Sequence, residues 1–168
     1  MEVKGYKAFN KGLTNRYGRK FELGKKYSTT GEISFGNDGN GFHFCKNIED
    51  TLRYFDAIDG EVEIAEVTGL DEIVTKEDEY NGYYDMYVAK TIIINNKIER
   101  KKLVNMFLTT ITSEPRVIRF IQLFKLTEKE IEMFKLKYAS SISIMDAIAY
   151  YQEDKKDVYE KRHKVKEK

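Results

Sequence analysis

Glycine is confined to one part of this chain. All 11 glycines lie at or before Gly82, residues 83–168 contain none, and Pro115 is the only proline. Because glycine marks tight turns and positive-φ positions, the first part is predicted to consist of strands and turns. The remainder, rich in Lys, Glu and Ile, is predicted to be helical. We therefore expect an α+β fold, with a small antiparallel or mixed sheet domain over residues 1–98 and a packed helical extension of three or four helices over residues 99–168.

Composition and charge exclude several classes of protein for this chain. The 44 Ile, Leu, Val and Phe residues are about 26% of the chain, above the roughly 20% below which disorder is expected. The 29 Lys and Arg nearly balance the 28 Asp and Glu, which argues against a dedicated nucleic-acid binder. No apolar run approaches the length of a membrane span, and the N-terminus lacks a signal-peptide pattern. A single cysteine suits a reducing compartment, so we expect a cytoplasmic protein without membrane association.

Period-two alternation predicts four strands. They cover Val3–Phe9, Gly41–Cys45, Glu61–Val67 and Met86–Ile94. Between the second and third strands, Asn47–Phe55 has the spacing of a helix with Asn47 as its N-cap. In the first strand the alternation places Lys7 on the same side as Phe9, and Tyr6 on the other.

Helix signals divide the second half of the chain. Ser113 is predicted to cap a helix that has Pro115 in its first turn, and Thr127 with Glu130 forms a capping-box pattern. Residues 153–168 are nearly all charged and are predicted to be a solvated tail. The apolar residues expected to face inward are Leu103, Val104, Phe107, Leu108, Ile111, Val117, Ile118, Ile121, Phe124, Ile131, Phe134, Tyr138, Met145, Ile148 and Ala149. In the tail, only Val158, Tyr159 and Val165 are apolar.

The segment Gly41–Asn47 has the highest density of chemically versatile side chains. His43 and Cys45 are two residues apart on a predicted strand and so share a face, as a nucleophile and its base would. A zinc site needs three or four ligands, and His163 is the only other histidine, so we predict no metal site. In the alternative interpretation Phe42 and Phe44 fill the core, and Cys45 acts as a small apolar residue.

Acidic, aromatic and basic groups supply further candidates. Glu61 and Glu63 could act in general acid–base chemistry or form the solvent side of a strand. Residues 1–30 hold eight Lys and Arg against two Glu, whereas residues 49–79 hold twelve Asp and Glu against two basic residues. The binding residues predicted from the aromatic cluster and the basic segment are Tyr80, Tyr83, Tyr84, Tyr87, Arg19 and Lys20.

Residues 1–100 resemble a family of uncharacterised bacterial and phage proteins. The resemblance lies in Gly5–Asn10, Leu23–Tyr27, Gly41–Asn47 and Val88–Ile92, with Asp50, Leu52 and Tyr54 following the Gly-Phe-His-x-Cys element. It implies a small α+β domain often encoded in phages or prophages, and it implies no activity.

A more distant similarity connects the same segment with ADP-ribosyltransferase-like domains. The opening strand, the Gly-Phe-His-Phe strand leading into a helix, and Glu61-Val62-Glu63 are similar to the layout of those enzymes. This resemblance implies a nicotinamide dinucleotide (NAD) site formed by Tyr6, Lys7, His43 and Glu61 or Glu63.

Two functional hypotheses follow. The first is a non-enzymatic phage or prophage accessory protein that binds a host or phage macromolecule, with a protein as partner and no cofactor. The alternative is an ADP-ribosyltransferase-like enzyme that uses NAD. Convergence of Tyr6, Lys7 and His43 on one cleft would favour the enzyme, and both hypotheses leave the oligomeric state open.

Overall fold

The computed structural model describes residues 1–36, 39–53, 55, 61–77 and 85–153. The chain divides into two compact units, Met1–Glu99 and Arg100–Lys168. In the described part of the chain, no helix is both long and apolar enough to cross a membrane.

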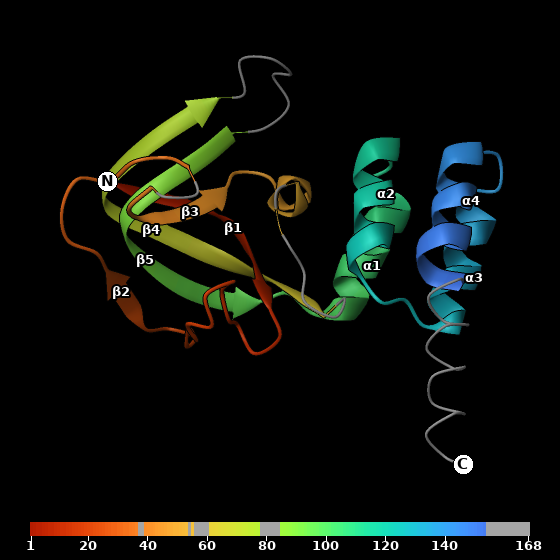
Figure 1. The fold of residues 1–168 in the computed structure, drawn as a ribbon, viewed down its shortest axis with the longest axis horizontal. Coiled ribbons are helices and arrows are strands. Elements are labelled where there is room, and N and C mark those ends of the chain that lie inside the picture. Colours follow the sequence, from red (N-terminus) through yellow and green to blue (C-terminus); the bar gives the residue numbers. More distant parts are fainter. Residues whose placement is uncertain (37–38, 54, 56–60, 78–84, 154–168) are drawn as a thin grey trace, which may run out of the picture. The chain divides into compact units, whose positions relative to one another are not determined.

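The first unit contains five antiparallel strands (Figure 1). They are β1 (Glu2–Asn10), β2 (Lys26–Ser28), β3 (Phe42–Cys45), β4 (Val62–Glu77) and β5 (Asp85–Lys97). Together with the four helices of the second unit, they confirm the α+β class with an antiparallel sheet.

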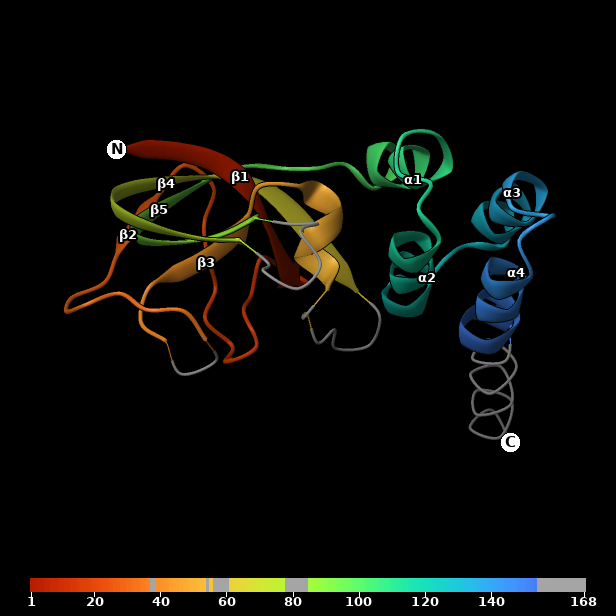
Figure 2. The same ribbon diagram turned by 90° about the horizontal axis from the view of Figure 1, so that it is seen from above.

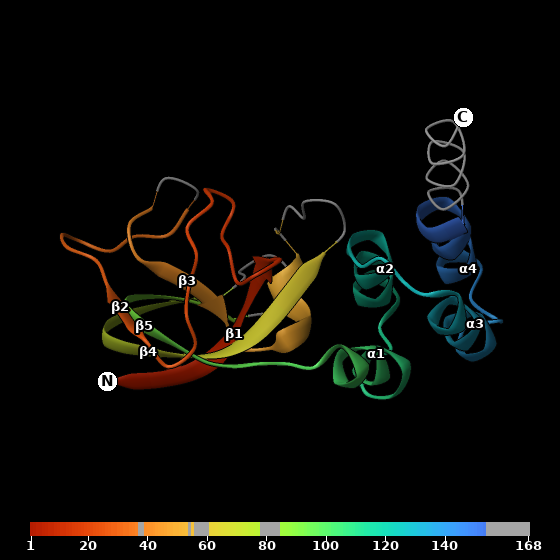
Figure 3. The same cartoon turned by 90° about the horizontal axis from the view of Figure 1, so that it is seen from below.

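The strand pairings close on themselves. β1 pairs with β4, β4 with β5, β5 with β3, and β3 with β1, while β2 adds to β5 beyond β3. We call this closed set the strand ring. The register of β4 against β5 shifts between Leu70 and Ile73, where Asp71 has a φ of 69°. Such bulges bend a strand, and the curvature of β4 and β5 is visible in Figures 2 and 3.

One face of these strands forms the apolar interior of the ring. Phe44 lies at its centre and is 2% exposed. A Cβ added at Gly5 would lie 2.7 Å from the Phe44 ring, and one added at Gly69 would lie 2.6 Å from it. The two glycines therefore make room for this side chain. The interior cluster comprises Phe9, Leu13, Phe21, Tyr27, Phe42, Phe44, Ala65, Val67, Ala89, Ile92 and Ile94.

Local structure differs from the sequence prediction at three places in this unit. β2 was not predicted, and β4 continues ten residues past the predicted end at Val67. The segment predicted as an α-helix is a 3₁₀-helix, η1 (Ile48–Leu52), and Asn47 makes no side-chain capping bond. Its amide Nδ2 instead donates to Asp50 Oδ2 at 3.3 Å. The helix has only five residues, and short helices of this kind are commonly 3₁₀. Ile48 and Leu52 are nevertheless buried, as expected.

The second unit contains four α-helices and a final π-helical turn. These are α1 (Arg100–Thr109), α2 (Glu114–Leu123), α3 (Glu128–Lys137), α4 (Ile142–Ile148) and η2 (Ala149–Glu153). Stacked rings join the helices at their centre. The Phe120 ring centroid lies 4.1 Å from that of Phe107, 4.3 Å from Phe124 and 5.8 Å from Phe134.

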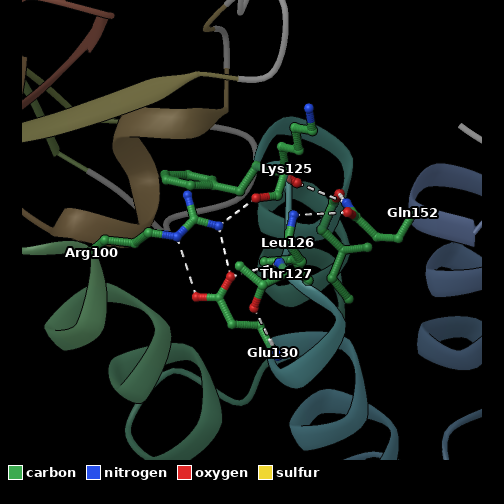
Figure 4. Close-up of polar contacts among 8 residues, drawn as sticks. Arg100, Lys125, Leu126, Thr127, Glu130 and Gln152 are labelled. Carbon is green, nitrogen blue, oxygen red and sulfur yellow. Dashed lines mark hydrogen bonds and ion pairs between the residues drawn. The ribbon is translucent and has the colours of Figure 1, made fainter. Parts of the chain in front are cut away.

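The helix starts agree only in part with the sequence prediction. Thr127 and Glu130 form the predicted capping box, and the Arg100 guanidinium binds the same carboxylate through Nε at 3.2 Å and Nη2 at 2.8 Å (Figure 4). Pro115 lies in the first turn of α2, and Ser113 occupies the predicted N-cap position, although its side chain makes no capping hydrogen bond. Ser113 has the extended backbone usual at an N-cap, and its carbonyl accepts the N–H groups of Arg116 at 3.1 Å and Val117 at 3.0 Å.

The inward face of α4 also differs from the prediction. Ile144, Ala147 and Ile148 are buried, whereas Met145 is half-buried and Ala149 is exposed. Ser141 ends the preceding turn and starts α4 by accepting a hydrogen bond from the Ile144 N–H at 3.3 Å. The turn between α3 and α4 interrupts the helical periodicity. Continuing the spacing of the inward-facing residues of α3 into α4 therefore selects the wrong residues.

Gln152 joins the last described turn of the second unit to α2 and to the connection between α2 and α3. The residue is 6% exposed, and its Oε1 accepts the Leu126 N–H at 3.0 Å. Its Nε2 donates to the carbonyls of Phe124, at 2.8 Å, and Ile121 (Figure 4). In the predicted tail, Glu153 pairs with Lys135, and Val158, Tyr159 and Val165 lie outside the described residues.

The interior position of Phe44 leads to a prediction about stability. Phe44→Ala should lower the free energy of unfolding by about 3–5 kcal/mol, because it removes a fully buried ring between two glycines. His43→Ala, the neighbouring change on the other strand face, should cost far less. Chemical denaturation of both variants measures the difference, and equal losses would contradict the assigned strand faces.

A second prediction concerns Gln152. Gln152→Ala should destabilise the protein by roughly 2–4 kcal/mol, because it leaves one buried N–H and two carbonyls without their partner. Tyr150→Ala is the matched control, since that ring is 67% exposed in the same turn, and it should change stability by less than about 0.5 kcal/mol. Denaturant unfolding followed by circular dichroism tests this prediction, and a neutral Gln152→Ala result would refute it.

Candidate functional site

The long connection between β1 and β2 is held against the strand ring. Thr14 bridges to both Asn10 and Lys20 in antiparallel fashion. The Phe21 N–H donates to the Leu13 carbonyl at 2.9 Å, and both side chains belong to the interior cluster. This connection is therefore an ordered part of the unit that can present side chains in fixed positions.

A tight turn within it is organised by Asn15. The side-chain Oδ1 of Asn15 accepts the N–H of Tyr17 at 3.0 Å and that of Arg19 at 2.9 Å. The backbone adds an N–H donated by Asn15 to the Arg19 carbonyl at 2.9 Å, and Gly18 supplies the required positive φ of 83°. Asparagine commonly holds turns in this way. The turn projects Arg16 and Tyr17 into solvent, and Tyr17 is 73% exposed.

Arg19 is an exposed residue, yet its guanidinium is positioned by aromatic rings. Its Cζ lies 5.1 Å from the ring centroid of Phe21, 5.2 Å from that of Tyr27 and 5.7 Å from that of Phe42. These are cation–π distances. Within the part of the chain that the structure describes, Arg19 has no carboxylate partner.

Two further cations lie beside aromatic rings nearby. The Arg16 Nη2 donates to the Tyr17 hydroxyl at 2.7 Å, with its Cζ 4.9 Å from that ring. Lys25 Nζ lies 5.4 Å from the Tyr27 ring centroid and 3.7 Å from Glu22 Oε2. We call Arg16, Tyr17, Arg19 and Lys25 the basic platform. Its donors and rings are suited to binding an acidic group.

Lys7 of β1 contacts His43 of β3 where these two strands pair, and we call this contact the Lys7–His43 seam. Lys7 Nζ donates to the His43 carbonyl at 2.6 Å. Burial lowers the pKa of Lys7 to about 8, against an opposing effect of Cys45. The pKa of His43 is lowered by burial and by the charges of Lys7 and Arg16, with a backbone hydrogen bond to Gly41 acting in the opposite direction. Nε2 of His43 is buried without a hydrogen-bond partner among the described residues.

Cys45 is buried and unreactive in character. Burial is the main cause that raises the pKa of its thiol to about 12, and the Asp50 charge adds to this effect. A thiol in this state is protonated at neutral pH and is a poor nucleophile. No cluster of three or more metal-ligating side chains occurs among the described residues.

The residues of the hypothetical NAD site are divided between the two strand faces. Tyr6 is adjacent to Lys7 in β1, so its side chain points to the face opposite that of Lys7. Lys7 contacts the backbone carbonyl of His43 rather than its imidazole, which lies on the strand face opposite Phe42 and Phe44. Glu63 accepts the Gly12 N–H through Oε1 at 2.9 Å, and its Oε2 lies 3.7 Å from Lys97 Nζ. Glu61 is exposed, with Oε2 3.5 Å from Lys11 Nζ. Both carboxylates are thus engaged near the start of β4.

The predicted binding residues fall into different environments. Tyr80, Tyr83 and Tyr84 lie outside the described residues. Tyr87 is half-buried, and its ring lies 5.1 Å from that of Phe44 on the interior side. Arg19 and Lys20 are both exposed, and Arg19 belongs to the platform. Sequence reasoning missed Tyr17, for which the Asn15-x-x-Gly18 turn pattern was the available signal.

Comparison with known proteins places this segment in a family. A family model described as a domain of unknown function, DUF7666, matches residues 3–106. The chain belongs to the DUF7666 family. The predicted membership of an uncharacterised family is thereby confirmed, and the DUF7666 match includes the basic platform, the Lys7–His43 seam and all five strands except the first residue of β1. Searches of curated proteins and of solved structures found no match.

The separation of the NAD-site residues in this DUF7666 unit leads to a third prediction. NAD at millimolar concentration should not raise the melting temperature, because Lys7 and Tyr6 lie on opposite faces of β1 and the two glutamates are engaged near the start of β4. A thermal-shift titration of wild type and His43→Ala measures this. A saturable rise that the His43 variant loses would instead support the enzyme hypothesis.

Proposed function

We propose that this chain is a phage or prophage accessory protein that binds an acidic surface of a protein partner through the basic platform. The observation that supports this proposal best is the state of Arg19. Its guanidinium lies over three rings, the residue is exposed, and it has no carboxylate partner among the described residues. The phage or prophage setting rests on the sequence resemblance.

The geometry of the platform favours binding at low entropic cost. Arginine stacked on aromatic rings keeps its in-plane N–H groups for an acceptor such as a carboxylate. The Asn15 turn already fixes the backbone around Arg16 and Tyr17, so little conformational freedom is lost when a partner binds. Arginine and tyrosine are also enriched among the residues that dominate interface energies.

The charge distribution favours a protein over a nucleic acid. The chain carries a formal net charge of only +1, and exposed carboxylates such as Asp71 and Glu72 lie on the same unit. A long polyanion would meet repulsion there, whereas a local acidic patch on a protein would contact the platform alone. Such contacts mainly steer association and set specificity.

The fourth prediction tests this binding function. Arg16→Glu with Arg19→Glu should weaken binding to the partner at least about tenfold, equivalent to about 1.4 kcal/mol. The control, Lys101→Glu with Lys102→Glu, makes the same change in net charge at exposed positions of α1 and should bind as wild type. Tyr17→Ala should weaken binding without changing charge.

The measurement is quantitative capture from host lysate on the immobilised full chain, followed by affinity determination with the purified partner at two salt concentrations. We expect a protein retained by wild type and by the control but lost by the platform variant, with affinity falling as salt rises. Melting temperatures establish that each variant is folded. Identical protein profiles for the folded platform variant and the control would contradict the proposal.

A further inference from the structure

β2 is an edge strand that pairs on one side only. Its three residues pair with β5, and among the strands that the structure describes none pairs with its other side (Figure 1). The residues on both sides of the buried Tyr27 are exposed, as are residues 22–25 before them. The open edge of β2 therefore lies at the protein surface.

The pairing with β5 determines which backbone groups face this open edge. Thr29 follows β2 in the same register, and its N–H donates to the Lys90 carbonyl at 3.0 Å. Because hydrogen-bonded and non-hydrogen-bonded pairs alternate along an antiparallel ladder, Lys26 and Ser28 direct their backbone groups away from β5. The Ser28 Oγ lies 2.9 Å from Thr91 Oγ1, as expected for the closer side chains of a non-hydrogen-bonded pair.

The outward backbone groups of β2 are available to an added strand. Lys26 and Ser28 each present one N–H and one C=O, and the described residues give these groups no hydrogen-bond partner. The open edge ends at Thr30, whose carbonyl already accepts a hydrogen bond from Asn40 Nδ2 at 2.7 Å. An extended chain can therefore form a short ladder here, as in complexes where a peptide adds a strand to a sheet edge.

Positive charge gathers at the same strand. Arg19 Cζ and Lys25 Nζ lie 5.2 and 5.4 Å from the ring centroid of Tyr27, the central residue of β2. Lys26 is exposed next to them and has no carboxylate partner among the described residues. Glu22, with Oε2 3.7 Å from Lys25 Nζ, offsets one of these three charges. An approaching strand thus meets a net positive edge, which favours acidic side chains.

We propose that an extended acidic segment of the protein partner adds to the open edge of β2 as a further strand. This docking mode rests on the proposed function and specifies what the basic platform recognises. The backbone groups of Lys26 and Ser28 bind the backbone of the segment, and its carboxylates contact the cations beside the strand. In such complexes main-chain hydrogen bonds supply affinity, and alternate side chains supply specificity.

A second copy of this chain fits the open edge less well. Two β2 strands side by side would bring Lys25 and Lys26 of both copies together, and like charges across a ladder are destabilising. Short strands and lysines are also the features by which sheet edges avoid pairing with their own kind. The same residues that oppose self-pairing favour a strand of opposite charge.

Hydrogen exchange on the full chain, labelled with ¹⁵N, tests strand addition directly. The probe is a synthetic peptide that alternates glutamate with valine. At millimolar peptide, exchange of the Lys26 and Ser28 amides should slow at least about tenfold, because both N–H groups become hydrogen-bonded. The matched peptide with lysine in place of glutamate should protect neither amide. Lack of protection by the glutamate peptide, equal protection by both peptides, or protection that grows with protein concentration alone would overturn the proposal.

Ser28→Pro, with Ser28→Ala as its control, isolates the backbone contribution. Proline removes the outward N–H without removing a hydrogen bond to β5, and both variants lose the same hydroxyl contact with Thr91. The proline variant should bind the glutamate peptide at least about tenfold more weakly than wild type, and the alanine variant should bind as wild type. Equal binding by the two folded variants would contradict strand addition. The exchange measurement on wild type decides the question if the proline variant does not fold.

The partner captured from lysate separates strand addition from the proposed function. Folded Ser28→Pro should lose that partner, as the variant with Arg16→Glu and Arg19→Glu does. If Ser28→Pro and Ser28→Ala both retain a partner that the platform variant loses, the proposed function stands and strand addition is wrong. If the glutamate peptide protects the edge but no partner is captured, strand addition stands and the proposed function is wrong.

Discussion

The pairing of β4 with β5 is the constraint on which the first unit depends. One edge of β5 follows β4 from Ala65 to Glu77, and its other edge pairs in turn with β3 and β2. The bulge near Asp71 bends the pair, so that β1 on the far edge of β4 can reach β3. The closed interior, the room for Phe44 and the position of Lys7 all follow from this curvature.

The sequence predicted those parts of the fold that depend on local alternation. Val3–Phe9 and Gly41–Cys45 were recognised because apolar and polar side chains alternate there, and the same pattern placed Lys7 on the side of Phe9. β2 was missed because it has three residues, of which only Tyr27 is buried. The second half of β4 was missed because its exposed charged residues hide the strand pattern. Both strands are stabilised by pairing with β5, which is distant in sequence.

The candidate sites, like the strands, were predictable only where a local sequence pattern specifies them. His43 and Lys7 were recognised as residues of interest, but their contact depends on the β1–β3 seam, which no local pattern specifies. The three rings beneath Arg19 come from Phe21, Tyr27 and Phe42, and only folding brings them together. The predicted N-caps show the same limit. Thr127, Ser113 and Asn47 all occupy N-cap positions, but only Thr127, which has a reciprocal partner at Glu130, makes the side-chain capping bond.

The three hydrogen bonds of Gln152 have a consequence for the order in which the second unit is completed during synthesis. Their partners are backbone groups of Ile121, Phe124 and Leu126, which leave the ribosome about 26–31 residues before Gln152. At roughly 5–20 residues per second, this gap lasts a few seconds. During that time these backbone groups form hydrogen bonds with water instead. The described helices of the unit therefore complete these contacts only after the turn that carries Gln152 has been synthesised.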